Sequence, residues 1–109
     1  KVFLSTIFLT LLVIMLCNYV YAEDIEYSEI ITGIVENDKT ISVNTHLLGI
    51  IIGNVTVNSG CIFSLEGSVI GDLTIEEGSS VVISGILEGN LYNNGGILEV
   101  TGIIKGTQQ

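Results

Sequence analysis

The feature that most constrains this chain is an internal repeat. Three consecutive segments of 18, 18 and 17 residues, beginning at Gly53, Gly71 and Gly89, align closely with one another. A fixed period of this size indicates an array in which each repeat is one structural unit stacked on the next. The period therefore indicates a repeat architecture, independently of the helix or strand propensity of any single segment.

Three glycines recur at matching positions in every repeat. Because glycine reaches backbone conformations that are forbidden to other residues, we expect each column to mark a corner between short strands. The three columns are Gly53/Gly71/Gly89, Gly60/Gly78/Gly95 and Gly67/Gly85/Gly102.

Between the glycines, apolar residues occupy every second position. Val55 and Val57, then Phe63 and Leu65, show this in the first repeat. A period of two is typical of a strand with one buried face. Three short strands per repeat predict an all-β chain, folded as a single-stranded parallel β-helix whose coils stack about 4.8 Å apart. An antiparallel meander is the alternative, although it does not require equal spacing between repeats.

Stacked coils bring equivalent residues of successive repeats into columns. Inward columns should be apolar, and a polar column beside the first corner should be held by hydrogen bonds between its side chains. The absence of proline fits this architecture, because proline would remove a ladder hydrogen bond from each coil it entered. The predicted inward column is Leu65/Ile83/Val100, and the predicted polar column is Asn54/Asp72/Asn90.

The sequence divides into three predicted parts. Residues 1–22 form an N-terminal signal helix, residues 23–36 an acidic lead that could cap the fold, and residues 37–109 a β-helix of about four coils. Within the β-helix, residues 37–52 form a degenerate first coil. Residues 30–35 could add one more strand before it.

Residues 1–22 have the layout of a secretory signal peptide. Lys1 precedes a long apolar run, and Val20-Tyr21-Ala22 supplies the small or apolar residues of a cleavage site. We therefore expect cleavage near Ala22–Glu23 and a secreted, periplasmic or extracellular protein. The alternative is an uncleaved membrane anchor, because the apolar run approaches the length that a bilayer requires.

The charge balance excludes several classes of partner. Three Lys+Arg against 12 Asp+Glu give a formal net charge of −9, and the chain has no arginine. Nucleic-acid binding requires a basic surface that displaces counterions, so we predict no nucleic-acid partner. Electrostatic docking on anionic lipid is disfavoured for the same reason.

Few side chains could support chemistry. His46 has no cysteine or second histidine near it for a metal site, and no Gly-x-Ser-x-Gly motif accompanies it. A lone Cys61 remains after signal cleavage, either buried as a small hydrophobe or available to pair between chains. We predict that the chain is not an enzyme and has no catalytic, cofactor-binding or metal-binding residues. The acidic residues at predicted corners are interpreted as solvated charges rather than as a glycosidase pair: Glu66, Glu76, Glu77 and Glu88.

The spacing Gly-Asn/Asp-Leu/Val-Thr, then a glycine, then Gly-x-Val/Ile-x-Gly resembles the bactofilins, or polymer-forming cytoskeletal proteins. The resemblance covers Gly49 to Gly106. It implies a compact right-handed β-helix that joins end to end into filaments without nucleotide. The secretory signal and the small number of coils depart from the family pattern.

Three functions are compatible with these features. The first is a structural protein that self-associates through its coil ends, where open strand edges invite pairing. The second is a secreted or surface binding module that presents one face to a glycan or protein. The third, least supported, is a secreted enzyme. In the first case the two ends would offer Leu98, Val100 and Ile104 on the C-terminal side and Ile41, Val43 and Ile51 on the N-terminal side.

Overall fold

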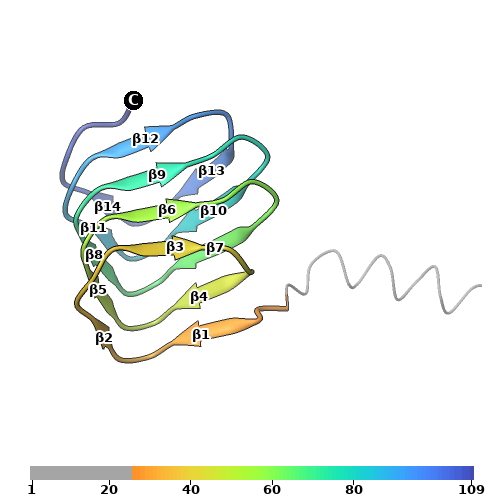
Figure 1. Cartoon of the computed structure of the whole chain (residues 1–109). Helices are drawn as coiled ribbons and strands as arrows, with labels where there is room; N and C mark the ends of the chain where they lie inside the picture. Colours follow the sequence, from red (N-terminus) through yellow and green to blue (C-terminus); the bar gives the residue numbers. More distant parts are fainter. Residues whose placement is uncertain (1–25) are drawn as a thin grey trace, which may run out of the picture.

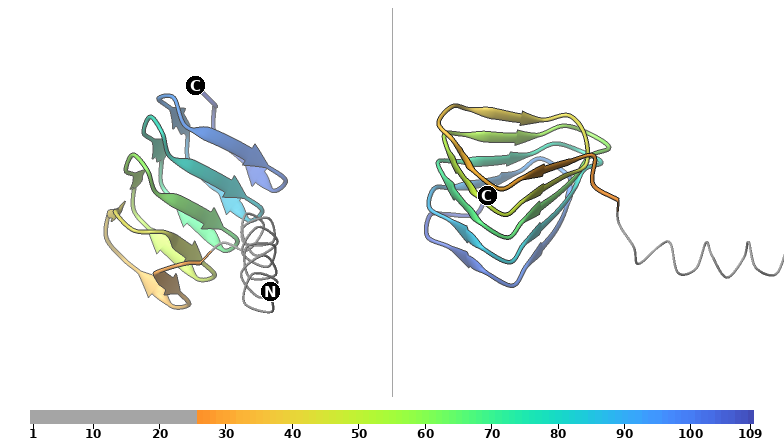
Figure 2. Two further views of the ribbon diagram at one scale, coloured as in Figure 1. Left: turned by 90° about the vertical axis from the view of Figure 1, so that its right-hand side faces the viewer. Right: turned by 90° about the horizontal axis from the view of Figure 1, so that it is seen from below.

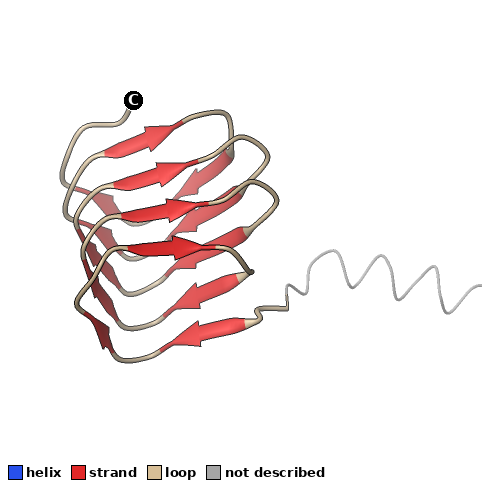
Figure 3. Cartoon of the chain, in the orientation of Figure 1, coloured by secondary structure: helices blue, strands red, loops and turns tan. Residues whose placement is uncertain are grey.

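The chain winds into a parallel β-solenoid of about four turns (Figures 1 and 3). The computed structural model describes residues 26–109, which contain fourteen strands. The predicted all-β, parallel solenoid is thereby confirmed. The predicted signal helix and its cleavage site at Ala22–Glu23 lie outside the described residues.

The regular secondary structure of residues 26–109 consists of strands, and no helix that could span a bilayer is found among these residues.

Each turn contributes strands to three parallel sheets, called A, B and C here, which enclose a common core (Figure 2). Every pairing joins equivalent strands of successive turns. Sheet A contains β1 (Glu29–Ile31), β4 (Thr45–Leu47), β7 (Ile62–Leu65), β10 (Ser80–Ile83) and β13 (Ile97–Val100). Sheet B contains β2 (Ile34–Val35), β5 (Ile50–Ile52), β8 (Ser68–Ile70), β11 (Ile86–Leu87) and β14 (Ile103–Ile104). Sheet C contains β3 (Lys39–Ile41), β6 (Val55–Val57), β9 (Leu73–Ile75) and β12 (Leu91–Asn93).

The register reproduces the columns that the repeat predicts. Leu65 aligns with Ile83, and Ile83 aligns with Val100, across β7, β10 and β13. Leu65 and Ile83 are fully buried, as expected for an inward column. Val100 is 37% exposed because β13 is the outermost strand of sheet A.

The solenoid begins earlier than the sequence indicated. β1 and β2 lie within residues 23–36, which were expected to form an acidic lead or cap, and they pair with β4 and β5. The single strand expected in residues 30–35 is instead divided between β1 and β2. The alternation is obscured in these strands, because the charged Glu29 occupies an inward position while Ile30 and Ile34 face outward.

The core is a narrow column of aliphatic side chains along the solenoid axis. Sixteen hydrophobic residues of the described chain are buried in it, and Phe63 is the one aromatic residue among them. Ile41 and Ile51, predicted to lie at the open N-terminal edge, are fully buried instead. Val43 is exposed, but it lies outside the named strands.

Glycine occupies these columns for two different structural reasons. Gly60 and Gly78 adopt φ values of +82° and +81°, as expected where a corner requires a left-handed conformation. The Gly67/Gly85/Gly102 column lacks positive φ, so the expectation of a special conformation was wrong there. A Cβ at Gly85 would overlap the carbonyl oxygen of Gly67 in the preceding coil. Close approach of two backbones selects glycine in this column.

Candidate interaction surfaces

A polar ladder runs along the corner between sheets B and C. The backbone N–H of Asp72 donates to Oδ1 of Asn54 (2.9 Å), and the N–H of Asn90 donates to Oδ1 of Asp72 (2.8 Å). Asp38 accepts from Asn54 N–H at one end, and Asn90 accepts from Thr107 N–H at the other. The predicted column therefore exists, but its side chains bind the backbone of the next coil rather than one another. Each side chain therefore fixes the position of the next coil along the solenoid axis.

This ladder makes Asp72 sensitive to truncation but not to conservative change. We expect Asp72→Ala to lower the free energy of unfolding by about 1–2 kcal/mol, because the N–H of Asn90 loses its acceptor. Asp72→Asn retains an oxygen at the same place and should cost less than about 0.5 kcal/mol. Urea denaturation of both variants measures the difference. Equal destabilisation by alanine and asparagine would show that charge, not the hydrogen bond, matters.

The acidic side chains predicted at corners lie at three different corners of the coil. Glu66 follows β7, the Glu76–Glu77 pair follows β9, and Glu88 follows β11. Glu88 accepts from Lys105 Nζ in the next coil at 2.9 Å. Among the residues that the structure describes, no three His, Cys, Asp or Glu side chains gather as a metal site would require.

His46 belongs to a small cluster on the outer face of sheet A. Its Nε2 lies 2.6 Å from Oε2 of Glu66, and its ring lies 5.0 Å from that of Tyr27, measured between centroids. The sequence left the role of His46 open. Glu66 is 20 residues away and belongs to the next coil, so only the stacking of coils reveals the contact.

Cys61 is buried at the corner between sheets C and A, with 8% of its surface exposed. This agrees with the expectation of a small buried hydrophobe. Buried thiols of this kind contribute packing rather than reactivity.

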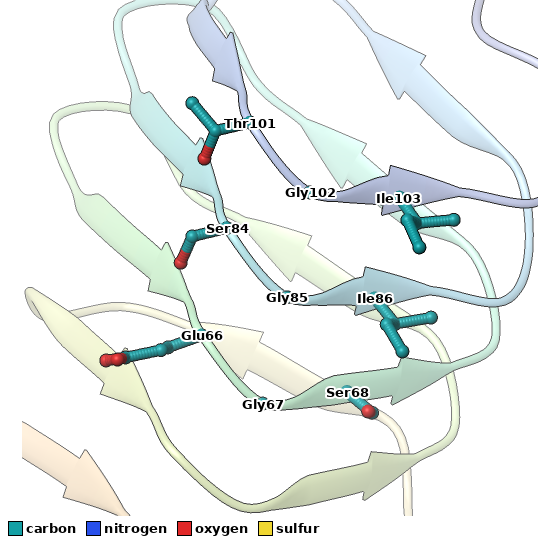
Figure 4. Close-up of a pocket in the computed structure, with 9 residues that line it drawn as sticks. All are labelled: Glu66, Gly67, Ser68, Ser84, Gly85, Ile86, Thr101, Gly102 and Ile103. Carbon is teal, nitrogen blue, oxygen red and sulfur yellow. The ribbon is translucent and has the colours of Figure 1, made fainter.

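A shallow groove follows the corner between sheets A and B (Figure 4). Its floor is the glycine column, where the lack of side chains leaves the backbone uncovered. The walls combine hydroxyl and aliphatic groups with one carboxylate. The Ser84 and Thr101 hydroxyls donate to the carbonyls of Leu65 and Ile83, at 3.4 and 3.5 Å, and their oxygens can accept hydrogen bonds along the groove. Glu66, Ser84 and Thr101 form one wall, and Ser68, Ile86 and Ile103 form the other. The sequence identified the corner but not the groove.

The C-terminal coil forms an open end of the described solenoid. Within residues 26–109, β13 and β14 each pair with one neighbour only. The N–H groups of Ile97 and Thr101 donate to Ser79 and Ile83 in the preceding coil, both at 2.8 Å. Because successive N–H groups of a strand point to opposite sides, the N–H of Val100 faces the free side. This end therefore presents strand donors beside apolar side chains.

The N-terminal coil is polar where the other coils are apolar. Glu29 aligns with Thr45, and through it with Phe63, while Lys39 aligns with Val55. The two charged side chains form an ion pair of 2.9 Å between Lys39 Nζ and Glu29 Oε1. An ion pair in these inward positions covers the end of the core with charge. The two ends of the solenoid consequently differ in chemistry.

No family model, curated protein or solved structure matches this chain. The function proposed below is therefore argued from the residues and contacts of the chain itself.

Proposed function

We propose that this chain is a secreted structural β-solenoid that self-associates end to end into a polymer or scaffold. The C-terminal coil carries the proposal, because it combines unpaired strand donors with partly exposed apolar side chains. Such an edge is a template for a further parallel strand. A head-to-tail contact that does not close on itself produces a filament.

The register of the sheets specifies how two copies would meet. Adding one more coil to sheet A places Ile31 of a second copy beside Val100, and Glu29 of that copy beside Leu98. The polar ladder would continue as well. Thr107 Oγ1 lies 3.3 Å from Asn90 Oδ1 and still has lone pairs that could accept the N–H of the second copy's Asp38.

The charged N-terminal end makes this contact weak and dependent on conditions. Joining the ends would take the Glu29–Lys39 pair out of water, which offsets part of the gain from apolar contact. The net charge of −9 adds repulsion between copies. Salt screens that repulsion, so assembly should increase with ionic strength.

The proposal is tested by light scattering of the purified protein across salt and protein concentration. We expect scattering to rise with salt in the wild type. Val100→Pro should abolish the rise, because it removes a donor on the free side while leaving the bonds to β10 intact. Its thermal unfolding should stay close to that of the wild type. A wild type that remains monomeric under every condition would contradict end-to-end assembly.

The location and the finer character of the fold belong to the same proposal. Secretion, with cleavage near Ala22–Glu23 or membrane anchoring if the segment stays uncleaved, is supported by the layout of residues 1–22. The resemblance to bactofilins supports a right-handed coil and filament formation without nucleotide. Neither catalysis nor a cofactor is part of the proposed role.

A second candidate is a binding module, which the groove at the corner between sheets A and B favours. Ser84 and Thr101 occupy equivalent positions in successive coils and present hydroxyl groups at the spacing of the coils, about 4.8 Å. Such a row could hydrogen-bond an extended glycan or peptide at a cell surface. A stable monomer that binds such a ligand would favour this function over the first.

A further inference from the structure

The outer face of sheet B carries a row of isoleucines. The register aligns one outward residue from each of its five strands, and we call these residues the isoleucine face. Ile34 and Ile103, at the two ends, are 64% and 56% exposed. Figure 4 shows Ser68, Ile86 and Ile103 standing on the same side of the sheet. In order along the solenoid, the isoleucine face is Ile34, Ile50, Ser68, Ile86 and Ile103.

The order of residue types along the isoleucine face is the same from either end of the solenoid. Its only polar member, Ser68, lies on β8, the central strand of the sheet, with two isoleucines on either side. The adjacent outward column has unlike ends, the acidic Glu36 and the basic Lys105, with Ile70 in the middle. Ile52 and Glu88 occupy its other two positions, and Glu88 accepts from Lys105 Nζ within the chain at 2.9 Å.

From this symmetry we infer that the isoleucine face packs against the same face of a second copy, with the order of coils reversed. A two-fold axis along the strand direction places Ile34 against Ile103 of the second copy and Ser68 against its own equivalent. The same rotation brings Glu36 of each copy beside Lys105 of the other. An isologous contact therefore matches apolar with apolar residues along the isoleucine face. In the adjacent column it brings each Glu36 to a Glu88–Lys105 ion pair and places Glu88 opposite Ile52.

The size of the face determines how strong this contact can be. Five strands about 4.8 Å apart, each two or three residues long, give a patch of roughly 20 by 10 Å. This is well below the roughly 800 Å² per partner of a standard stable interface. We therefore expect a weak, reversible dimer that forms at high protein concentration. It uses a side of the solenoid and is independent of the end-to-end contact proposed above.

Sedimentation velocity in the Val100→Pro background tests the inference, because that substitution blocks the open end. We expect a concentration-dependent dimer, and Ile86→Lys should weaken it by at least about tenfold. Thr74→Lys, on the outer face of sheet C, is the matched control and should leave it unchanged. Added lysine lowers the net negative charge, so a loss of dimer in Ile86→Lys cannot result from greater repulsion.

A charge exchange tests the orientation of the two copies. The exchange is made in the Val100→Pro background, because end-to-end stacking would also bring Glu36 of one copy beside Lys105 of another. Lys105→Glu alone and Glu36→Lys alone should each weaken the dimer, and the combined variant should recover affinity relative to Lys105→Glu. Both substituted residues are exposed, so all three variants should fold. Absence of a dimer in the background protein, equal effects of Ile86→Lys and Thr74→Lys, or no recovery in the combined variant would each overturn the inference. End-to-end assembly is judged separately, with Val100 intact.

Discussion

Ile83→Asp is expected to lower the free energy of unfolding by at least about 3 kcal/mol, and it could prevent folding altogether. Ile83 is fully buried between Leu65 and Val100 in the inward column of sheet A. A carboxylate there would have apolar side chains in the coils above and below it, with no cation to pair with. Circular dichroism during urea denaturation measures the loss.

Val82→Asp is the matched control for this prediction. Val82 is the preceding residue of the same strand, and its side chain points outward between those of Ser64 and Glu99. We expect a cost below about 1 kcal/mol, mostly from the nearby Glu99. Equal stability of Ile83→Asp and the wild type would show that this column faces water, and the solenoid described here would be wrong.

Gly85→Ala should be nearly as damaging, although it adds a single methyl group. The new Cβ would overlap the backbone of Gly67 and Glu66 in the preceding coil. That backbone cannot move aside, because the N–H of Ile86 donates to the carbonyl of Gly67 at 3.0 Å. Relief requires the two coils to separate, which breaks ladder hydrogen bonds. We expect a loss of about 3 kcal/mol, at the upper end for overpacking.

Gly33→Ala provides the control within the same column. A Cβ at Gly33 would have no heavy atom within 4 Å, and its φ is not positive. Alanine should therefore be neutral there or stabilise the fold by about 0.5 kcal/mol, through the unfolded state. Thermal unfolding of both variants makes the comparison. Similar losses at Gly33 and Gly85 would mean that glycine is needed for conformation, not for close approach of coils.

The repeat allowed most of the fold to be predicted from sequence. Matching positions in the three repeats placed Leu65 and Ile83 in one buried column, because parallel stacking converts sequence period into spatial neighbourhood. The start of the solenoid was predicted only in part, as one possible strand in residues 30–35. The inward positions of this coil hold Glu29 and Lys39, which interrupt the apolar alternation and form an ion pair instead.

The surfaces were less predictable than the core. The contact between His46 and Glu66 is diagonal between coils, so no column of equivalent residues indicates it. The isoleucine face was also hidden, because outward and inward isoleucines look alike in a strand such as β5, Ile50–Ile52. The palindromic order of the face becomes visible only when the register has been assigned. The polar ladder was predicted as a column of side chains. Only the structure shows that these side chains accept hydrogen bonds from backbone N–H groups of the next coil.

Electron microscopy combined with fibre diffraction of the protein at high salt tests end-to-end assembly most directly. We predict filaments that elongate along the solenoid axis, with a reflection at about 4.8 Å along the filament, because the strands run across that axis. Val100→Pro should give no filaments under the same conditions. Particles no longer than a single solenoid, at every salt and protein concentration, would contradict the proposed structural role.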